Sequence, residues 1–144
     1  MKTSTDLALK REELIESGKL LNTAETFTAR VYVGLYDTES DLEQSQIKLR
    51  RSCQQFVEEV GLCVNVQETV YQYGSNRTGG KEKGAVVELI HYPRFEHGNP
   101  EEKITVNALD LAEMLMEEFH QKRVSVVTNT ETYTLQNPDH EDVL

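Results

Sequence analysis

Hydrophobic and polar residues alternate in several short stretches of the chain, and this period of two is typical of β-strands with one buried face. The clearest case is residues 28–36, where Ala29, Val31 and Val33 fall on one face and Arg30 on the other. On the same grounds we expect strands over residues 28–36, 62–73, 85–92 and 124–127, with an optional short strand over residues 131–135.

Two longer segments instead repeat apolar residues every three or four positions, which predicts helices with one face on a core. Leu49 and Phe56 belong to the first repeat, and Leu111 and Leu115 to the second. We expect these four side chains to be buried. The capping box formed by Ser40 and the glutamate three residues later predicts that the first helix begins there.

The order of these elements predicts the fold class. After an N-terminal helix over residues 4–17, the chain reads β-α-β-β-α-β, which is the order of a ferredoxin-like α+β fold: an antiparallel sheet with two helices on one face. The predicted organisation is an N-terminal helical extension at residues 1–25, a ferredoxin-like α+β domain at residues 26–136, which ends on the possible short C-terminal strand, and an acidic flexible tail at residues 137–144.

A glycine-rich segment at residues 74–84 separates the second and third predicted strands, which favours a hairpin with a long, mobile tip. Its spacing comes close to a P-loop, but glycine stands in the lysine position and both flanks are strands, so nucleotide hydrolysis of that type is excluded. Arg77, Lys81 and Lys83 give the segment local positive charge. Two interpretations stay open: a plain flexible tip, or a loop that closes over an anionic ligand or a partner.

The predicted sheet face opposite the helices mixes aromatic and hydrogen-bonding side chains, among them Arg30, Tyr32 and Tyr71. Such a composition is enriched in interfaces. We expect another copy of the chain to cover this face, which predicts a homo-oligomer, or the face to line a ligand cavity at a subunit junction. Cover by the N-terminal helix is the rival interpretation.

Residues 91–97 combine imidazole, guanidinium and aromatic groups after the end of a strand. His91 and Arg94 are therefore candidate ligand or partner contacts, and His91 is the candidate general base if the protein is an enzyme, because its ordinary pKa suits proton transfer near neutral pH. No third metal ligand accompanies the two histidines of this segment, so no metal site is predicted, and no cofactor is expected.

The formal net charge of −10 weighs against nucleic acid and against an anionic membrane surface as partners. The alternative that the acidic surface imitates nucleic acid rests on charge alone. The first residues carry no apolar stretch suited to secretion, and no apolar run has the length of a membrane span, so a cytoplasmic protein is predicted.

The layout resembles ferredoxin-like domains, which include PII-type signalling proteins, small amino-acid-binding regulatory domains and cofactor-free dimeric monooxygenases and isomerases. PII-type proteins carry their ligand-responsive loop where residues 74–84 lie here. The resemblance concerns layout only, so it carries no functional residues to this chain.

No signature of a catalytic serine, a zinc protease or a catalytic cysteine–histidine pair appears in the sequence. The leading hypothesis is therefore a non-enzymatic binding or regulatory protein that acts through a partner protein or a small ligand. The alternative is a small cofactor-independent enzyme with a cavity between the sheet face and the 91–97 loop.

Overall fold

The computed structural model describes residues 4–20, 23, 25–37, 42–91 and 99–138. Within these residues the helices are α1 (Ser4–Glu16), α2 (Gln46–Val60) and α3 (Pro100–Glu118), and the strands are β1 (Thr28–Gly34), β2 (Tyr36–Asp37), β3 (Leu42–Glu43), β4 (Val64–Ser75), β5 (Thr78–Ile90), β6 (Arg123–Thr128) and β7 (Thr132–Gln136).

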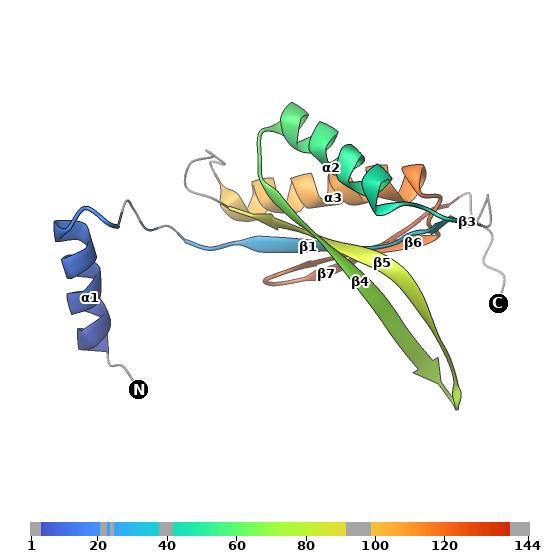
Figure 1. Ribbon diagram of the computed structural model, residues 1–144, viewed down its shortest axis with the longest axis horizontal. Coiled ribbons are helices and arrows are strands. Elements are labelled where there is room, and N and C mark those ends of the chain that lie inside the picture. The colour runs from blue at the N-terminus through green and yellow to red at the C-terminus, as the bar shows by residue number, and fades with distance from the viewer. Residues whose placement is uncertain (1–3, 21–22, 24, 38–41, 92–98, 139–144) are drawn as a thin grey trace.

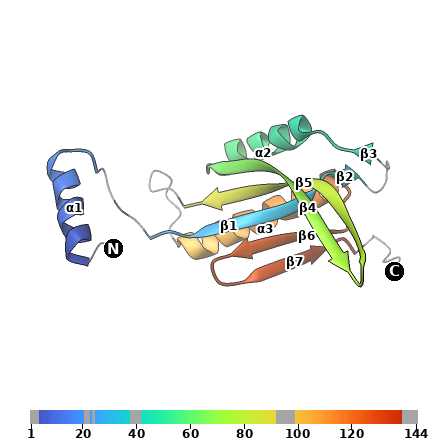
Figure 2. The same ribbon diagram turned by 60° about the horizontal axis from the view of Figure 1, so that its bottom comes forward.

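The main sheet has the strand order β4-β5-β1-β6-β7, with every neighbouring pair antiparallel. Helices α2 and α3 cover the same face of this sheet, and the opposite face has no helix against it (Figure 1, Figure 2). The predicted ferredoxin-like α+β fold is confirmed. The optional C-terminal strand is present as β7, which adds a fifth strand at the edge beside β6.

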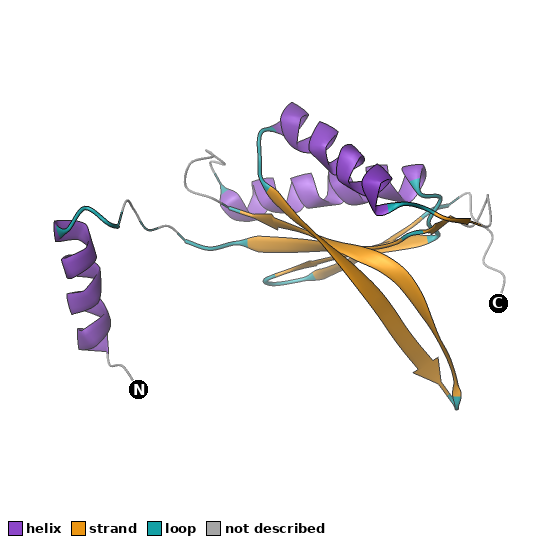
Figure 3. Cartoon of the chain, viewed as in Figure 1, coloured by secondary structure: helices purple, strands orange, loops and turns teal. Residues whose placement is uncertain are grey.

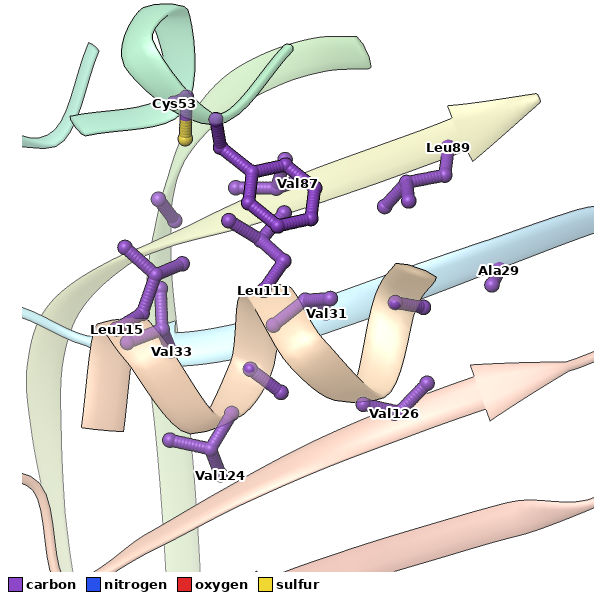
Figure 4. Packing of buried hydrophobic residues seen from close by; sticks show 14 of the residues in the cluster. Ala29, Val31, Val33, Cys53, Val87, Leu89, Leu111, Leu115, Val124 and Val126 are labelled. Carbon is purple, nitrogen blue, oxygen red and sulfur yellow. The ribbon is translucent and has the colours of Figure 1, made fainter. Parts of the chain in front are cut away.

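The core lies between the sheet and the two helices. Val31 and Val33 of β1 and Leu111 and Leu115 of α3 are all fully buried there, and Cys53 of α2 closes the cluster from above (Figure 4). The four apolar side chains predicted to be buried, Leu49, Phe56, Leu111 and Leu115, are buried. The alternating pattern of residues 28–36 therefore gave the correct inward face.

Helix α2 begins later than the predicted capping box. Its N-cap is Ser45, whose Oγ accepts a hydrogen bond from the backbone N–H of Lys48 at 3.1 Å. Ser40 lies outside the described residues, and the glutamate of the predicted box belongs to β3. Helix α3 begins as a proline-initiated helix, with Asn99 as its N-cap.

The predicted length of the tip between β4 and β5 is wrong, and its mobility stays a prediction. The two strands pair continuously up to Ser75↔Thr78, and only Asn76 and Arg77 form the turn, so strand structure continues almost to the tip (Figure 3). Both turn residues have positive φ, 48° and 70°, as two-residue hairpin turns with the twist of their strands require. The hairpin is a ribbon that projects beyond the rest of the sheet, away from the helices (Figure 1).

Helix α1 has the predicted bounds within a residue and ends before Gly18, which has a φ of 74°. It lies apart from the sheet and its helices (Figure 1). Its apolar residues Leu7, Leu9 and Ile15 are exposed, so it does not cover the open face of the sheet. None of the helices in the described part of the chain is long and apolar enough to cross a membrane.

Candidate functional site

The open face of the sheet carries an ion pair, two neighbouring tyrosines and a pocket. In β1 the side chains of Val31 and Val33 point to the helices, so Arg30, Tyr32 and Gly34 belong to the open face. The residues paired with them in β5 share that face. Arg30 is paired there with Glu88, whose Oε2 lies 2.7 Å from the arginine Nε.

Tyr71 and Glu82 face each other across β4 and β5, at the point where the ribbon leaves the sheet. The Tyr71 ring also lies near Tyr32 of β1, with ring centroids 6.4 Å apart and planes tilted by 54°. A phenol and a carboxylate are therefore held side by side on the open face, next to a second aromatic ring.

A pocket of about 420 Å³ opens at this point, and its volume falls in the usual range for small-ligand sites. Its lining comes from β1, β2, β4, β5 and the start of β6, and consists of Tyr32, Gly34, Tyr36, Tyr71, Glu82, Gln121, Lys122, Arg123 and Ser125. A neighbouring pocket of about 500 Å³ shares Tyr36 and Glu82 with it. Glu82 thus lies between two adjoining hollows at the base of the ribbon.

Tyr71 is held in place by backbone acceptors. Its hydroxyl donates to the carbonyl oxygen of Ala85 at 2.6 Å and lies 3.4 Å from that of Val33. Burial raises the pKa of Tyr71 to about 12, and the neighbouring Tyr32 and Glu82 add to this, although the contact with Val33 acts in the opposite direction. At neutral pH the side chain is therefore a neutral phenol that forms hydrogen bonds and does not act as a base.

Glu82 is half-buried, and desolvation raises the pKa of its carboxyl group. It is the one carboxylate among the residues that line the 420 Å³ pocket. Lys122 and Arg123 lie on the far side of β1 from it, at the start of β6. The pocket therefore has an acidic group on one side and basic groups on the other.

Gln121 is buried beneath the pocket, just after α3. Its amide nitrogen donates to the carbonyl oxygens of Tyr36 and Phe119, at 2.5 and 2.9 Å. Because these bonds take up the amide N–H groups, the remaining polar atom of the side chain is the acceptor Oε1. The sequence gave no reason to select either Gln121 or Glu82.

The structure brings only part of the predicted site together. Arg30, Tyr32 and Tyr71 share the open face, but Arg77 lies in the turn at the tip of the ribbon. Lys81 and Lys83 alternate with Glu82 along β5, so they project from the opposite side of the ribbon. The three basic residues therefore do not form one cluster with Tyr32 and Tyr71, although Lys81 and Lys83 line the neighbouring 500 Å³ pocket.

His91 lies at the other end of β5 from Glu82. Its backbone N–H donates to the carbonyl oxygen of Phe27 at 3.1 Å, before β1 begins. At roughly 3.3 Å per residue, the strand separates His91 from Glu82 by about 30 Å. The structure thus does not place this histidine at the pocket, and Arg94 and the rest of the 91–97 loop lie outside the described residues.

The other reactive side chains show no site of their own. Burial, with a smaller contribution from Glu118, raises the pKa of Cys53 to about 11, so this thiol is a poor nucleophile at neutral pH. Among the residues that the structure describes, no group of three or more histidine, cysteine, aspartate or glutamate side chains is placed to hold a metal ion.

No protein-family model matches the chain, and no curated protein matches it in sequence. Solved structures do match. A phage SAM lyase in complex with S-methyl-5′-thioadenosine superposes with a TM-score of 0.63 at 19% identity, over 85% of this chain and 99% of the lyase. A structure of a phage SAM lyase in the apo state superposes with a TM-score of 0.62 at 18% identity, with the same coverage of both chains. The fold of this chain is therefore similar to that of the phage enzyme.

This comparison overturns the prediction of a non-enzymatic binding or regulatory protein. The two solved structures described above, which share the fold, are those of an enzyme. The similarity favours the alternative interpretation, a small enzyme. The pocket that the structure offers for it is at the base of the β4–β5 ribbon, not beside His91.

Proposed function

We propose that this protein is a small, cofactor-independent enzyme that cleaves S-adenosylmethionine and releases S-methyl-5′-thioadenosine. The observation that carries the proposal is the facing pair of Tyr71 and Glu82, which opens into a tyrosine-lined pocket on a fold similar to that of a phage SAM lyase. A partly desolvated carboxylate beside a half-buried phenol in a hollow is an arrangement typical of functional sites.

The charges of the pocket suit this substrate. S-adenosylmethionine carries a positive sulfonium and an amino-acid end with an ammonium and a carboxylate group. Glu82 offers the negative partner for a cation, and the faces of Tyr32 and Tyr71 attract cations as well. Lys122 and Arg123, on the opposite side of the pocket, suit the substrate carboxylate.

The raised pKa of Glu82 is consistent with a role in binding a cation. Desolvation disfavours the charged carboxylate in the free protein. A positive group that enters the pocket favours the charged form again, so substrate binding lowers the pKa of Glu82. Tyr71 contributes a fixed hydrogen-bonding group, since its phenol keeps its proton at neutral pH.

The proposed bond cleavage needs few catalytic groups from the protein. To release S-methyl-5′-thioadenosine, the bond between the sulfonium sulfur and the γ-carbon of the amino-acid chain must break, and its electron pair stays on sulfur. The leaving group becomes a neutral thioether, so it needs no proton from an acid. Because the positive charge on sulfur disappears in this step, a partly desolvated pocket favours it.

The amino-acid fragment can be completed in three ways. Attack by the substrate's own carboxylate on the γ-carbon gives homoserine lactone, and attack by water gives homoserine and a proton that passes to the solvent. Loss of a proton from the β-carbon gives vinylglycine, and only this route requires a base from the protein. Glu82 is the carboxylate that lines the pocket, so it is the group for that role.

The proposal is tested by incubating the purified protein with S-adenosylmethionine and measuring S-methyl-5′-thioadenosine by chromatography with mass spectrometry. We expect product from the wild type and a loss of at least about 10-fold in kcat/KM for Glu82→Gln and for Tyr71→Phe. Matched controls are Glu68→Gln, an exposed glutamate on the helix-facing side of β4, and Tyr133→Phe in β7. Equal activity in all four variants, or no product from the wild type, would contradict the proposal.

We further propose that a second copy of the chain covers part of the open face. The support is the exposure of Tyr36 and Tyr73 around the base of the ribbon, with 40% and 63% of these residues accessible. Large apolar side chains grouped in this way are typical of contact surfaces. Sedimentation of the wild-type protein tests self-association independently of any catalytic activity.

A further inference from the structure

Two glycines face each other at the floor of the pocket: Gly34 in β1 pairs with Gly84 in β5. Their neighbours Val33 and Ala85 are fully buried toward the helices, so the glycines belong to the pocket side of the sheet. Neither glycine has the positive φ that side chains disfavour. The reason for glycine at these positions is therefore space, not backbone conformation.

At Gly84 the space is filled by the ring of Tyr71. A Cβ atom on Gly84 would overlap with the Cε2 atom of that ring and would lie 2.6 Å from the carbonyl oxygen of Val33. Because the ring lies where a side chain would stand, its hydroxyl reaches the carbonyl oxygen of Ala85 at 2.6 Å. The position of the phenol depends on the missing side chain of Gly84.

At Gly34 the space is filled by two oxygen atoms. A Cβ atom there would overlap with Oε1 of Glu82 and would lie 2.7 Å from Oε1 of Gln121. The amide of Gln121 is fixed by its two hydrogen bonds to backbone carbonyls, so it cannot move away easily. The carboxylate of Glu82 is the group that would have to move.

We propose that the facing pair Gly34–Gly84 positions the two polar groups of the site, by leaving the floor on which the Tyr71 ring and the Glu82 carboxylate lie. The consequence for turnover rests on the proposed function, but the geometry does not. Both glycines are positioning residues: they act through Tyr71 and Glu82 and do not themselves need to contact a substrate.

A methyl group on Gly34 is the cleaner perturbation. It meets only side-chain atoms, and it pushes the Glu82 carboxylate from the sheet toward water. Since desolvation is the cause of the raised pKa of Glu82, that pKa should fall toward its ordinary value in Gly34→Ala. If the proposed function holds, KM for S-adenosylmethionine should rise by about 10-fold or more, because a charge-assisted contact is lost.

A methyl group on Gly84 displaces a different group. It should push the Tyr71 ring away and break the bond to Ala85, so the pKa of Tyr71 should fall from about 12 toward 10. The short approach to the backbone oxygen of Val33 makes this variant the less tolerant of the two. If Gly84→Ala does not fold, Gly34→Ala alone decides the question.

The experiment follows the side-chain carboxyl carbons of ¹³C-labelled glutamate by NMR during a pH titration, with Glu82→Gln to assign the resonance. The phenol is followed by its ultraviolet absorbance at alkaline pH. Gly80→Ala is the matched control, because its Cβ would meet only the ring of Tyr73, which is 63% exposed and free to turn aside. We expect the Glu82 pKa to fall in Gly34→Ala and to stay unchanged in the control.

The proposal is overturned if Gly34→Ala is folded, by circular dichroism and thermal unfolding, and the titration of Glu82 is the same as in the wild type. The two proposals fail separately. A wild type that does not cleave S-adenosylmethionine refutes the proposed function, yet a lowered Glu82 pKa in Gly34→Ala still supports the positioning role. An unchanged pKa refutes the positioning role whatever the activity.

Discussion

Replacing Glu82 with glutamine separates binding from stability, because the two should change in opposite directions. The amide has nearly the shape of the carboxylate, so the pocket and its contact with Gly34 are kept while the negative charge is removed. A hydrogen bond to a charged group contributes about 1.5–3 kcal/mol, which corresponds to a factor of about 10 to about 150 in a dissociation constant. Binding of S-adenosylmethionine should weaken by that factor.

The same substitution should stabilise the folded protein at neutral pH. Desolvation raises the pKa of Glu82 above its value in the unfolded chain, so the native state holds this proton to a higher pH than the unfolded state does. The wild type therefore loses stability relative to Glu82→Gln as pH rises from the unfolded pKa through the folded one. Below the unfolded pKa both side chains are uncharged, and the difference should disappear.

Two measurements check this reasoning. Isothermal titration calorimetry compares S-adenosylmethionine with S-methyl-5′-thioadenosine, which lacks the sulfonium charge and the amino-acid end. Glu82→Gln should weaken binding of the first ligand strongly and of the second little. Urea denaturation between pH 4 and pH 8 gives the stability difference. An equal loss of affinity for both ligands, or a stability difference that does not change with pH, would show that Glu82 is not a desolvated cation contact.

Three further predictions concern the rest of the molecule. Tyr71→Phe should lower the free energy of unfolding in urea by about 0.5–1.5 kcal/mol, because the hydrogen bond to Ala85 is lost. It should also remove a tyrosine that titrates near pH 12, and with it the loss of stability that the raised folded pKa causes between pH 10 and 12. An unchanged alkaline titration contradicts this. Phe56→Ala should cost roughly 3–5 kcal/mol, and a loss below about 1 kcal/mol would place α2 in solvent. Sedimentation at tens of micromolar should show an oligomer. Salt should strengthen it by screening the net charge of −10, and Tyr32→Glu should weaken it. A monomer at every salt concentration refutes self-association.

The sequence predicted the layers of the fold well, because burial sets a simple period. Ala29, Val31 and Val33 alternate with polar residues, and all three are fully buried. The repeat containing Leu111 and Leu115 likewise identified the inward face of α3. Each of these elements buries one face against the core, so the spacing of its apolar residues along the chain directly shows which face is buried.

The length of the ribbon was misjudged because its glycines were taken as signs of a long loop. Gly84 is a strand residue that gives room to a tyrosine ring from the neighbouring strand, and Gly34 serves the carboxylate of Glu82 in the same way. A glycine in a strand can mark the close approach of another group, but the group comes from elsewhere in the chain. Local propensity does not contain that information.

The site was only half predicted for the same reason. Tyr32 and Tyr71 were selected from the alternation of their strands, but Glu82 lay in the segment that was predicted to be the tip of a hairpin. With the turn placed at Asn76–Arg77, the register would have set Glu82 opposite Tyr71. His91 was selected by residue type, and the length of β5 separates it from the pocket.

The ribbon has a consequence for the order in which parts of the protein open. Beyond Gly84, toward the tip, β5 is no longer paired with β1 in the ladder, and its ladder partner is β4 alone. A two-stranded ribbon is only marginally stable in water by itself. Tyr71 and Glu82 lie at the boundary between this ribbon and the five-stranded sheet, so a ligand bound there holds the base of the ribbon closed. Occupancy of the pocket should therefore slow amide exchange in a segment that the ligand does not touch.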